Sequence, residues 1–140
     1  EWSLLVPADE VLLVSADRML PTDRVSVAAG GCGNFDFRRP RRIGDAVLNN
    51  AYTSLVSETD GLVRVRVTDS GGVGAEIEWD VQAPWVQIYT SDEPSGQEFR
   101  HAVAVEPMTC PPDAFNSGID LRVLSEHETT SIAWTVRALG

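Results

Sequence analysis

The sequence predicts an all-β fold, an antiparallel β-sandwich that occupies residues 1–140 as one domain. Short apolar runs, about eight to ten of them, recur at regular intervals between turn residues, which is typical of such sandwiches. Helical periodicity is almost absent, and one pair of alternating runs gives a clear hairpin signal. Because no internal repeat or low-complexity tract interrupts this pattern, we expect the strands to share one core.

The composition describes a globular protein and excludes several classes of partner. Apolar residues make up 43% of the chain and charged residues 23%, which are ordinary values for soluble domains. The formal net charge of −10 argues against nucleic acid or an anionic membrane as a partner, because both attract cationic surfaces. No apolar run approaches membrane-spanning length, and no signal-type leader is visible.

The two cysteines, Cys32 and Cys110, are too few for a disulfide framework and lack the neighbours of a metal site. We therefore expect two free thiols, no metal ion and no cofactor. Free thiols are typical of a reducing compartment, so the expected location is the cytoplasm.

The first third of the chain consists of apolar runs joined by turns. A Pro-Ala-Asp turn separates the first two runs, and a later turn leads into a third. A glycine-rich connector follows, but it lacks the helix and the Lys-Ser/Thr pair of a phosphate cradle. One short segment has helical spacing and predicts one or two helical turns. In order, these elements are Trp2–Val6, Glu10–Ser15, Val25–Ala28, the connector Gly30–Gly33 and the helical segment Ile43–Asn49.

The clearest local structure is a hairpin of Leu62–Thr68 and Val73–Trp79. In both runs apolar residues alternate with charged ones, arginines in the first and glutamates in the second. The turn residues Asp69–Gly72 lie between them, so the pair is antiparallel with one buried face. We expect the arginine and glutamate rows to face water, where each cross-strand pair contributes at most about 1 kcal/mol.

Pro84–Thr90 predicts another strand with two distinct faces. Trp85, Gln87 and Tyr89 share one face, and two aliphatic residues share the other. Two aromatic rings beside an amide make a platform on which a sugar can stack and form hydrogen bonds. These residues alone also permit a core strand with both aromatic rings packed inward.

Ala102–Asn116 is the stretch in which we expect the chemistry. Glu106 precedes Pro107, and a residue before proline is pushed into an extended conformation. Pro107 cannot donate to a sheet ladder, so pairing either ends there or the strand lies at an edge. Glu106 and Ala104 share one face, which leaves room for a ligand above the small residue. The same residues also permit an ordinary strand end whose glutamate faces water.

Three segments remain. Arg38–Arg42 holds four arginines around a proline, which indicates either solvated surface or a site for phosphate or carboxylate. Leu121–Leu124 and Thr130–Ala138 predict the closing strands.

Placed in this order, the residues resemble the C-terminal half of the aldose 1-epimerase (galactose mutarotase) family. The matching segments occur in the same order as in the family and extend along nearly the whole chain. Trp134 lies where the family has an aromatic residue in its last strand. The matching segments are Leu20–Thr22, Phe35–Pro40, Val86–Thr90, Val105–Pro107 and Pro112–Asn116. The resemblance implies part of a galactose mutarotase-like supersandwich.

The resemblance also implies a function, the interconversion of the α and β anomers of a hexose. Glu106 matches the family's general base, which takes the proton from the anomeric hydroxyl. Gln87 matches a glutamine that contacts the sugar, and we expect Trp85 and Tyr89 beside it. A base must be held within hydrogen-bond reach of its proton, and a strand end before a proline satisfies that requirement.

This chain also departs from the family. The resemblance implies that family members are much longer, and we expect the half with two sugar-binding histidines and a substrate arginine to precede this chain. We expect that half as a partner, either in the same chain or as a separate one, and little activity without it. Neither His101, on the strand face opposite Glu106, nor His127, in a polar turn, matches the catalytic acid. Where galactose mutarotases often carry Asn-Gly-Phe-Asp-His, this chain reads Leu48–Thr53, with Tyr52 near the place of the sugar-binding aspartate.

Two other functions stay open from the sequence. The loss of that aspartate favours a non-catalytic carbohydrate-binding or regulatory sandwich. The arginines of Arg38–Arg42 would suit a sugar-phosphate epimerase.

Overall fold

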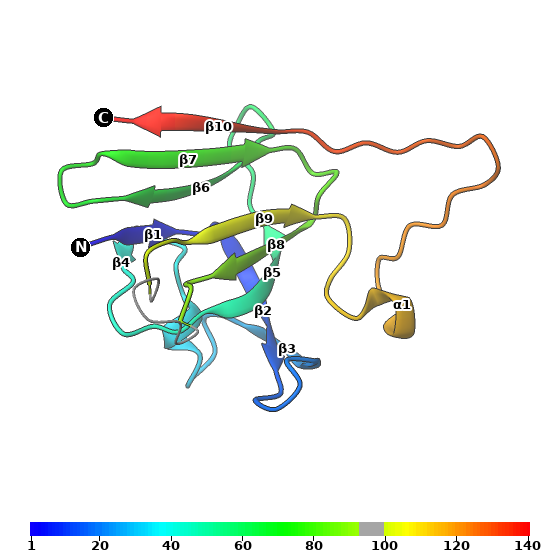
Figure 1. Cartoon of the computed structure of the whole chain (residues 1–140), viewed down its shortest axis with the longest axis horizontal. Helices are drawn as coiled ribbons and strands as arrows, with labels where there is room; N and C mark the ends of the chain where they lie inside the picture. Colours follow the sequence, from blue (N-terminus) through cyan, green and yellow to red (C-terminus); the bar gives the residue numbers. More distant parts are fainter. Residues whose placement is uncertain (93–99) are drawn as a thin grey trace.

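Two five-stranded antiparallel sheets pack against each other in the computed structural model of the chain (Figure 1), which describes residues 1–92 and 100–140. The first sheet contains β1 (Ser3–Leu5), β4 (Arg41–Arg42), β6 (Val63–Thr68), β7 (Gly74–Trp79) and β10 (Trp134–Leu139). The second contains β2 (Ala8–Val14), β3 (Pro21–Ser26), β5 (Asn49–Leu55), β8 (Trp85–Tyr89) and β9 (Ala104–Met108). Their strand orders are β10-β7-β6-β1-β4 and β3-β2-β5-β8-β9. The predicted all-β sandwich is therefore confirmed.

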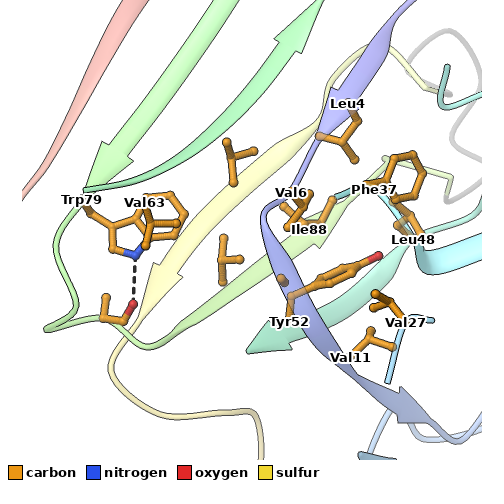
Figure 2. Packing of buried hydrophobic residues seen from close by; sticks show 14 residues of the cluster. Leu4, Val6, Val11, Val27, Phe37, Leu48, Tyr52, Val63, Trp79 and Ile88 are labelled. Atoms are coloured by element: carbon orange, nitrogen blue, oxygen red, sulfur yellow. Dashed lines mark hydrogen bonds between the residues drawn. The ribbon is translucent and has the colours of Figure 1, made fainter. Parts of the chain in front are cut away.

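The core lies between the two sheets, and strands of both sheets point alternate residues into it, whereas β10 is almost entirely exposed. Apolar side chains from both sheets meet there, and Figure 2 shows the cluster. The indole nitrogen of Trp79 is satisfied within it, since its Nε1 donates to the carbonyl of Ala83 at 2.9 Å. The larger buried side chains are Leu4, Val6, Val11, Val27, Phe37, Leu48, Tyr52, Val63, Val65, Trp79 and Ile88.

The predicted hairpin is confirmed as β6 and β7, but its charged face is not wet. Arg64, Glu76 and Glu78 are only 9%, 5% and 5% exposed. Arg64 donates from Nε to Glu78 Oε2 at 3.0 Å, and Arg66 donates from Nε to Glu76 Oε2 at 2.6 Å. The acidic segment before β6 and the added strand β10 surround this face with further charged partners, Glu58, Asp60 and Arg137. The rows thus form a covered ion-pair network, because neighbouring elements shield them from solvent.

The N-terminal runs form strands, but consecutive strands belong to different sheets. β1 pairs with β4 and β6, whereas β2 pairs with β3 and β5. β3 begins earlier than expected, at Pro21, a position that proline tolerates because the strand lies at the sheet edge. The prediction of helical turns at Ile43–Asn49 is wrong. Gly44 has a positive φ of 54°, and a single non-helical turn forms, in which the Ala46 N–H donates to the Ile43 carbonyl. The chain then enters β5 at Asn49.

The C-terminal segment differs most from its prediction. α1 (Ala114–Ser117) is a single helical turn, and the expected strand Leu121–Leu124 is absent from the described secondary structure. The chain then follows an extended path beyond the sheets and returns as β10 alongside β7 (Figure 1). β10 covers Trp134–Leu139 instead of Thr130–Ala138, because ladder pairing with β7 begins only at the Trp134–Trp79 pair.

The sandwich is open at one end. A cavity of about 710 Å³ lies between the sheets, with Val65 and Ile77 on one wall and Val103 and Val105 on the other. On the outermost strand β10, Trp134 remains 57% exposed. This opening shows that the described strands do not cover the whole inner face of the first sheet.

Candidate active site on the outer face of the second sheet

A cleft of about 460 Å³ lies on the face of the second sheet that points away from the core. Strand pairing assembles it. Gln87 on β8 is the direct partner of Glu106 on β9, and Tyr89 on β8 is the direct partner of Asn49 on β5. Directly paired residues of an antiparallel sheet project from the same face, so these four side chains converge. The full lining is Asn49, Gln87, Tyr89, Glu106, Met108 and Pro112.

Glu106 is exposed at this cleft, in the middle of β9. Of the two expectations for Pro107, the edge position is correct. Pairing continues through Pro107, which is opposite Val86, and ends one residue later at Met108. Because β9 is the last strand of its sheet, the missing N–H of proline costs no ladder hydrogen bond on the open side. The carboxylate therefore stands on an ordered strand with access to solvent and to a ligand.

Gln87 is oriented by a neighbour that the sequence did not single out. Its Nε2 donates to Oδ1 of Asn49 at 2.8 Å. Its Oε1 is buried and has no hydrogen-bond partner among the described residues. Buried polar atoms are nearly always paired, so a lone buried acceptor at the wall of a cleft is a position that a donor can satisfy.

The two aromatic residues predicted beside Gln87, Trp85 and Tyr89, differ in their exposure to the cleft. Tyr89 is half-buried and lines the cleft. Trp85 lies on the same face but is only 1% exposed, packed with Leu12, Ala51 and Met108. Its Nε1 donates to Oδ2 of Asp120 at 2.8 Å. Trp85 is thus a covered support beneath the cleft and offers no open ring on which a sugar can stack.

Tyr52 does not belong to the cleft. It is 1% exposed on the opposite face of β5, with its hydroxyl directed toward Leu48 inside the core (Figure 2). That hydroxyl has no hydrogen-bond partner among the described residues. Burial raises the pKa of the Tyr52 phenol, because the phenolate form would lose its hydration.

The residue of this strand that reaches the cleft is Asn49. Alternation along β5 decides this, since Asn49 and Ala51 share the outer face whereas Asn50 and Tyr52 face inward. Applying the same alternation to Leu48–Thr53 would have separated Asn49 from Tyr52, but the pairing of β5 with β8 was needed to bring Asn49 to the cleft. Matching by motif alone pointed to Tyr52 instead.

Neither histidine reaches Glu106. His101 is exposed before β9 and lines the cavity between the sheets. His127 lies in the C-terminal segment with a side chain 90% exposed, 3.4 Å from the carboxylate of Glu126. The described part of the chain therefore contains a candidate base but no histidine that could serve it as the acid.

Arg38 and Arg41 of the arginine cluster form hydrogen bonds within the chain. Arg38 donates to Asp36 at 2.8 Å, and this hydrogen bond holds the pKa of the Asp36 carboxyl below its usual value. Arg41 donates to the carbonyls of Gly33 and Asn34 at 2.7 and 3.0 Å. These contacts make Arg38 and Arg41 part of the scaffold of the loop 33–42, although Nε of Arg41 is buried without a hydrogen-bond partner among the described residues. A sugar-phosphate site at this cluster stays a prediction.

Within residues 1–92 and 100–140, no group of three or more His, Cys, Asp or Glu side chains is arranged to hold a metal ion. Cys32 and Cys110 are both free and half-buried, as predicted. In the same described ranges, no helix is both long enough and apolar enough to cross a membrane.

Comparisons with known proteins support the observed fold and show the family of the chain. The sequence model of the aldose 1-epimerase family matches residues 3–136, so the chain belongs to the aldose 1-epimerase family. Among solved structures, the chain is similar to a GalM/aldose epimerase homologue from C. elegans, with a TM-score of 0.59 and 23% sequence identity. That likeness covers 76% of this chain and 36% of the other one, and it supports the galactose mutarotase-like sandwich.

A curated relative is the uncharacterized protein YihR of Escherichia coli (strain K12). It is 55% identical over 40 residues, which are 29% of this chain and 12% of YihR. The chain thus spans little more than a third of the solved homologue and about an eighth of YihR. These comparisons give no support to a separate second chain that would supply the remaining strands.

Proposed function

We propose that the protein containing this chain interconverts the α and β anomers of a hexose, with Glu106 as the general base. One observation carries the proposal: Glu106 and Gln87 are direct cross-strand partners that open onto one cleft on the outer face of the sheet. The match of the family model over residues 3–136 supports the reaction class. The free thiols Cys32 and Cys110 support a cytoplasmic location.

The chemistry follows from the groups present. Glu106 takes the proton of the anomeric hydroxyl, the C1–O5 bond breaks, and an acid protonates the ring oxygen. Rotation about C1–C2 and reclosure with the reverse proton transfers give the other anomer. Gln87 and Tyr89 would bind sugar hydroxyls from β8. Neither His101 nor His127 lines the cleft, so neither histidine supplies that acid in this proposal.

The test is the Glu106→Gln variant of the intact protein, assayed by polarimetry or NMR exchange on freshly dissolved α-glucose. A general base contributes about 10²–10⁴-fold to the rate, so we expect a loss of at least about 100-fold. Folding should be unchanged, because Glu106 is exposed and forms no ion pair with another described residue. Glu126→Gln, in the exposed C-terminal segment, is the matched control and should keep full activity.

Retention of most of the activity by Glu106→Gln would contradict the assignment of the base. A second function, a carbohydrate-binding module without turnover, is favoured by the absence of a histidine at the described cleft. Sugar binding by the intact wild-type protein with no acceleration of anomer exchange would support that second function instead.

A further inference from the structure

The two ends of the Gln87 amide, which lines the cleft, have opposite chemistry. An amide carries a donor, Nε2, and an acceptor, Oε1, on the same planar carbon. Nε2 is turned toward β5 and donates to Asn49 Oδ1 at 2.8 Å. Turning the nitrogen toward β5 turns the oxygen away from it, and Oε1 is left buried without a partner among the described residues.

The neighbour on the other side of Gln87 is Glu106, its direct partner on β9. An ionised carboxylate has only acceptor atoms, so it cannot satisfy the Gln87 oxygen. A turned-over amide would instead direct Nε2 toward Glu106 and donate to it. A hydrogen bond to the charged form of a carboxylate stabilises that form and makes it a poorer proton acceptor. The orientation of Gln87 therefore matters to any proton transfer at Glu106.

We propose that Asn49 is a positioning residue that holds the Gln87 amide with its oxygen, not its nitrogen, toward Glu106. In this arrangement the carboxylate keeps its lone pairs for the substrate proton. Once Glu106 is protonated, its O–H can donate to Gln87 Oε1, the acceptor that has no partner among the described residues. The link to catalysis rests on the proposed function, but the orientation of the amide does not.

Asn49 can itself turn over, because its side chain also has a donor and an acceptor. Asn49→Asp removes that freedom, since an aspartate can only accept a hydrogen bond. If Asn49 accepts from Gln87 in the wild type, Asn49→Asp leaves the amide of Gln87 where it was. If Asn49 donates instead, the same substitution forces Gln87 to turn over. Asn49→Ala removes the partner altogether.

The first measurement is the exchange rate of the Gln87 side-chain NH₂ protons by ¹⁵N NMR in the purified protein without sugar. One hydrogen bond corresponds to about fivefold in an equilibrium constant, so Asn49→Ala should speed exchange of the bonded proton about fivefold. Asn49→Asp should keep the protection and the chemical shifts close to those of the wild type. Asn34→Ala, an exposed asparagine distant in sequence, is the matched control and should change neither.

Unchanged exchange in Asn49→Ala, or Asn49→Asp behaving like Asn49→Ala, would overturn the orientation. The second measurement is the pH profile of kcat/KM for anomer exchange in the intact protein. Among the described residues, Tyr89 is the only titratable one besides Glu106 that lines the cleft. A new hydrogen bond to a carboxylate should lower kcat/KM about tenfold in Asn49→Ala and move the acid limb of the profile to lower pH.

The two proposals can fail separately. Lost NH₂ protection with an unchanged kcat/KM profile would overturn the link between Asn49 and Glu106. A wild-type protein without any turnover would defeat the proposed function, and the amide exchange would still decide whether Asn49 orients Gln87.

Discussion

Replacing Tyr52 by Phe should make the protein more stable, although Tyr52 is among its most buried residues. The ring is 1% exposed, and its hydroxyl has no hydrogen-bond partner among the described residues. Phe retains the ring and its contacts with the core and removes only the unpaired oxygen. Most core substitutions destabilise a protein, so a gain in stability here would be informative.

The size of the gain follows from the cost of an unpaired buried polar group, which is about 1–3 kcal/mol. We take the low end of this range and expect a gain of about 1 kcal/mol. For a domain of this size, 1 kcal/mol corresponds to a rise of about 3 °C in Tm.

The pKa shift adds a second signature at alkaline pH. Burial raises the pKa of Tyr52 in the folded state above its unfolded value of about 10. A group with a raised pKa in the folded state contributes stability that is fully present below pH 10 and is lost as the pH rises beyond it. The Phe variant should therefore lose less stability between neutral pH and pH 11 than the wild type does.

Urea denaturation at pH 7 and at alkaline pH measures both effects, and Tyr89→Phe is the matched control. Tyr89 is half-buried on the outer face, so its variant should change stability by less than about 0.5 kcal/mol. A loss of 1 kcal/mol or more in Tyr52→Phe would refute the reasoning, because it would mean that the hydroxyl is paired in solution. A weaker sugar affinity in Tyr52→Phe would likewise contradict its place in the core.

Two further predictions concern the β6–β7 hairpin. Hydrogen bonds from Arg64 and from the Leu62 backbone lower the pKa of Asp60 to about 2, so Asp60 stabilises the fold above pH 4 and this contribution is lost as the pH falls toward 2. Asp60→Asn should flatten the acid limb of stability against pH, and an unchanged limb would contradict the pairing. At Gly74 an added Cβ would lie 2.0 Å from the backbone oxygen of β6, so Gly74→Ala should cost about 3 kcal/mol in urea denaturation. Gly30→Ala, with open space around it, should stay within about 0.5 kcal/mol, and equal effects at the two glycines would refute the steric argument.

The alternation of apolar and polar residues predicted strands correctly wherever one face of the strand is buried in the core. The β6–β7 hairpin and the two faces of β8 were predicted from alternation alone, because the inward and outward positions differ in polarity. The same argument placed Glu106 on one face with Ala104, and Gln87 on one face with Trp85 and Tyr89, and it left open which face points away from the core. The prediction of helical turns at Ile43–Asn49 was wrong. Three apolar residues there have helical spacing, but Gly44 adopts a positive φ and the chain forms a turn.

Alternation along a strand indicates which side chains share a face, and it therefore predicted the sandwich and the hairpin. It does not state which strands become neighbours or what covers an outer face. Only the tertiary structure placed β5 beside β8, so that Asn49 meets Gln87 while Tyr52 is sealed in the core. Only the tertiary structure covered Trp85 and the charged rows of the hairpin. The physical reason is that burial and hydrogen-bond partners depend on contacts between segments distant in sequence, which a local period cannot specify.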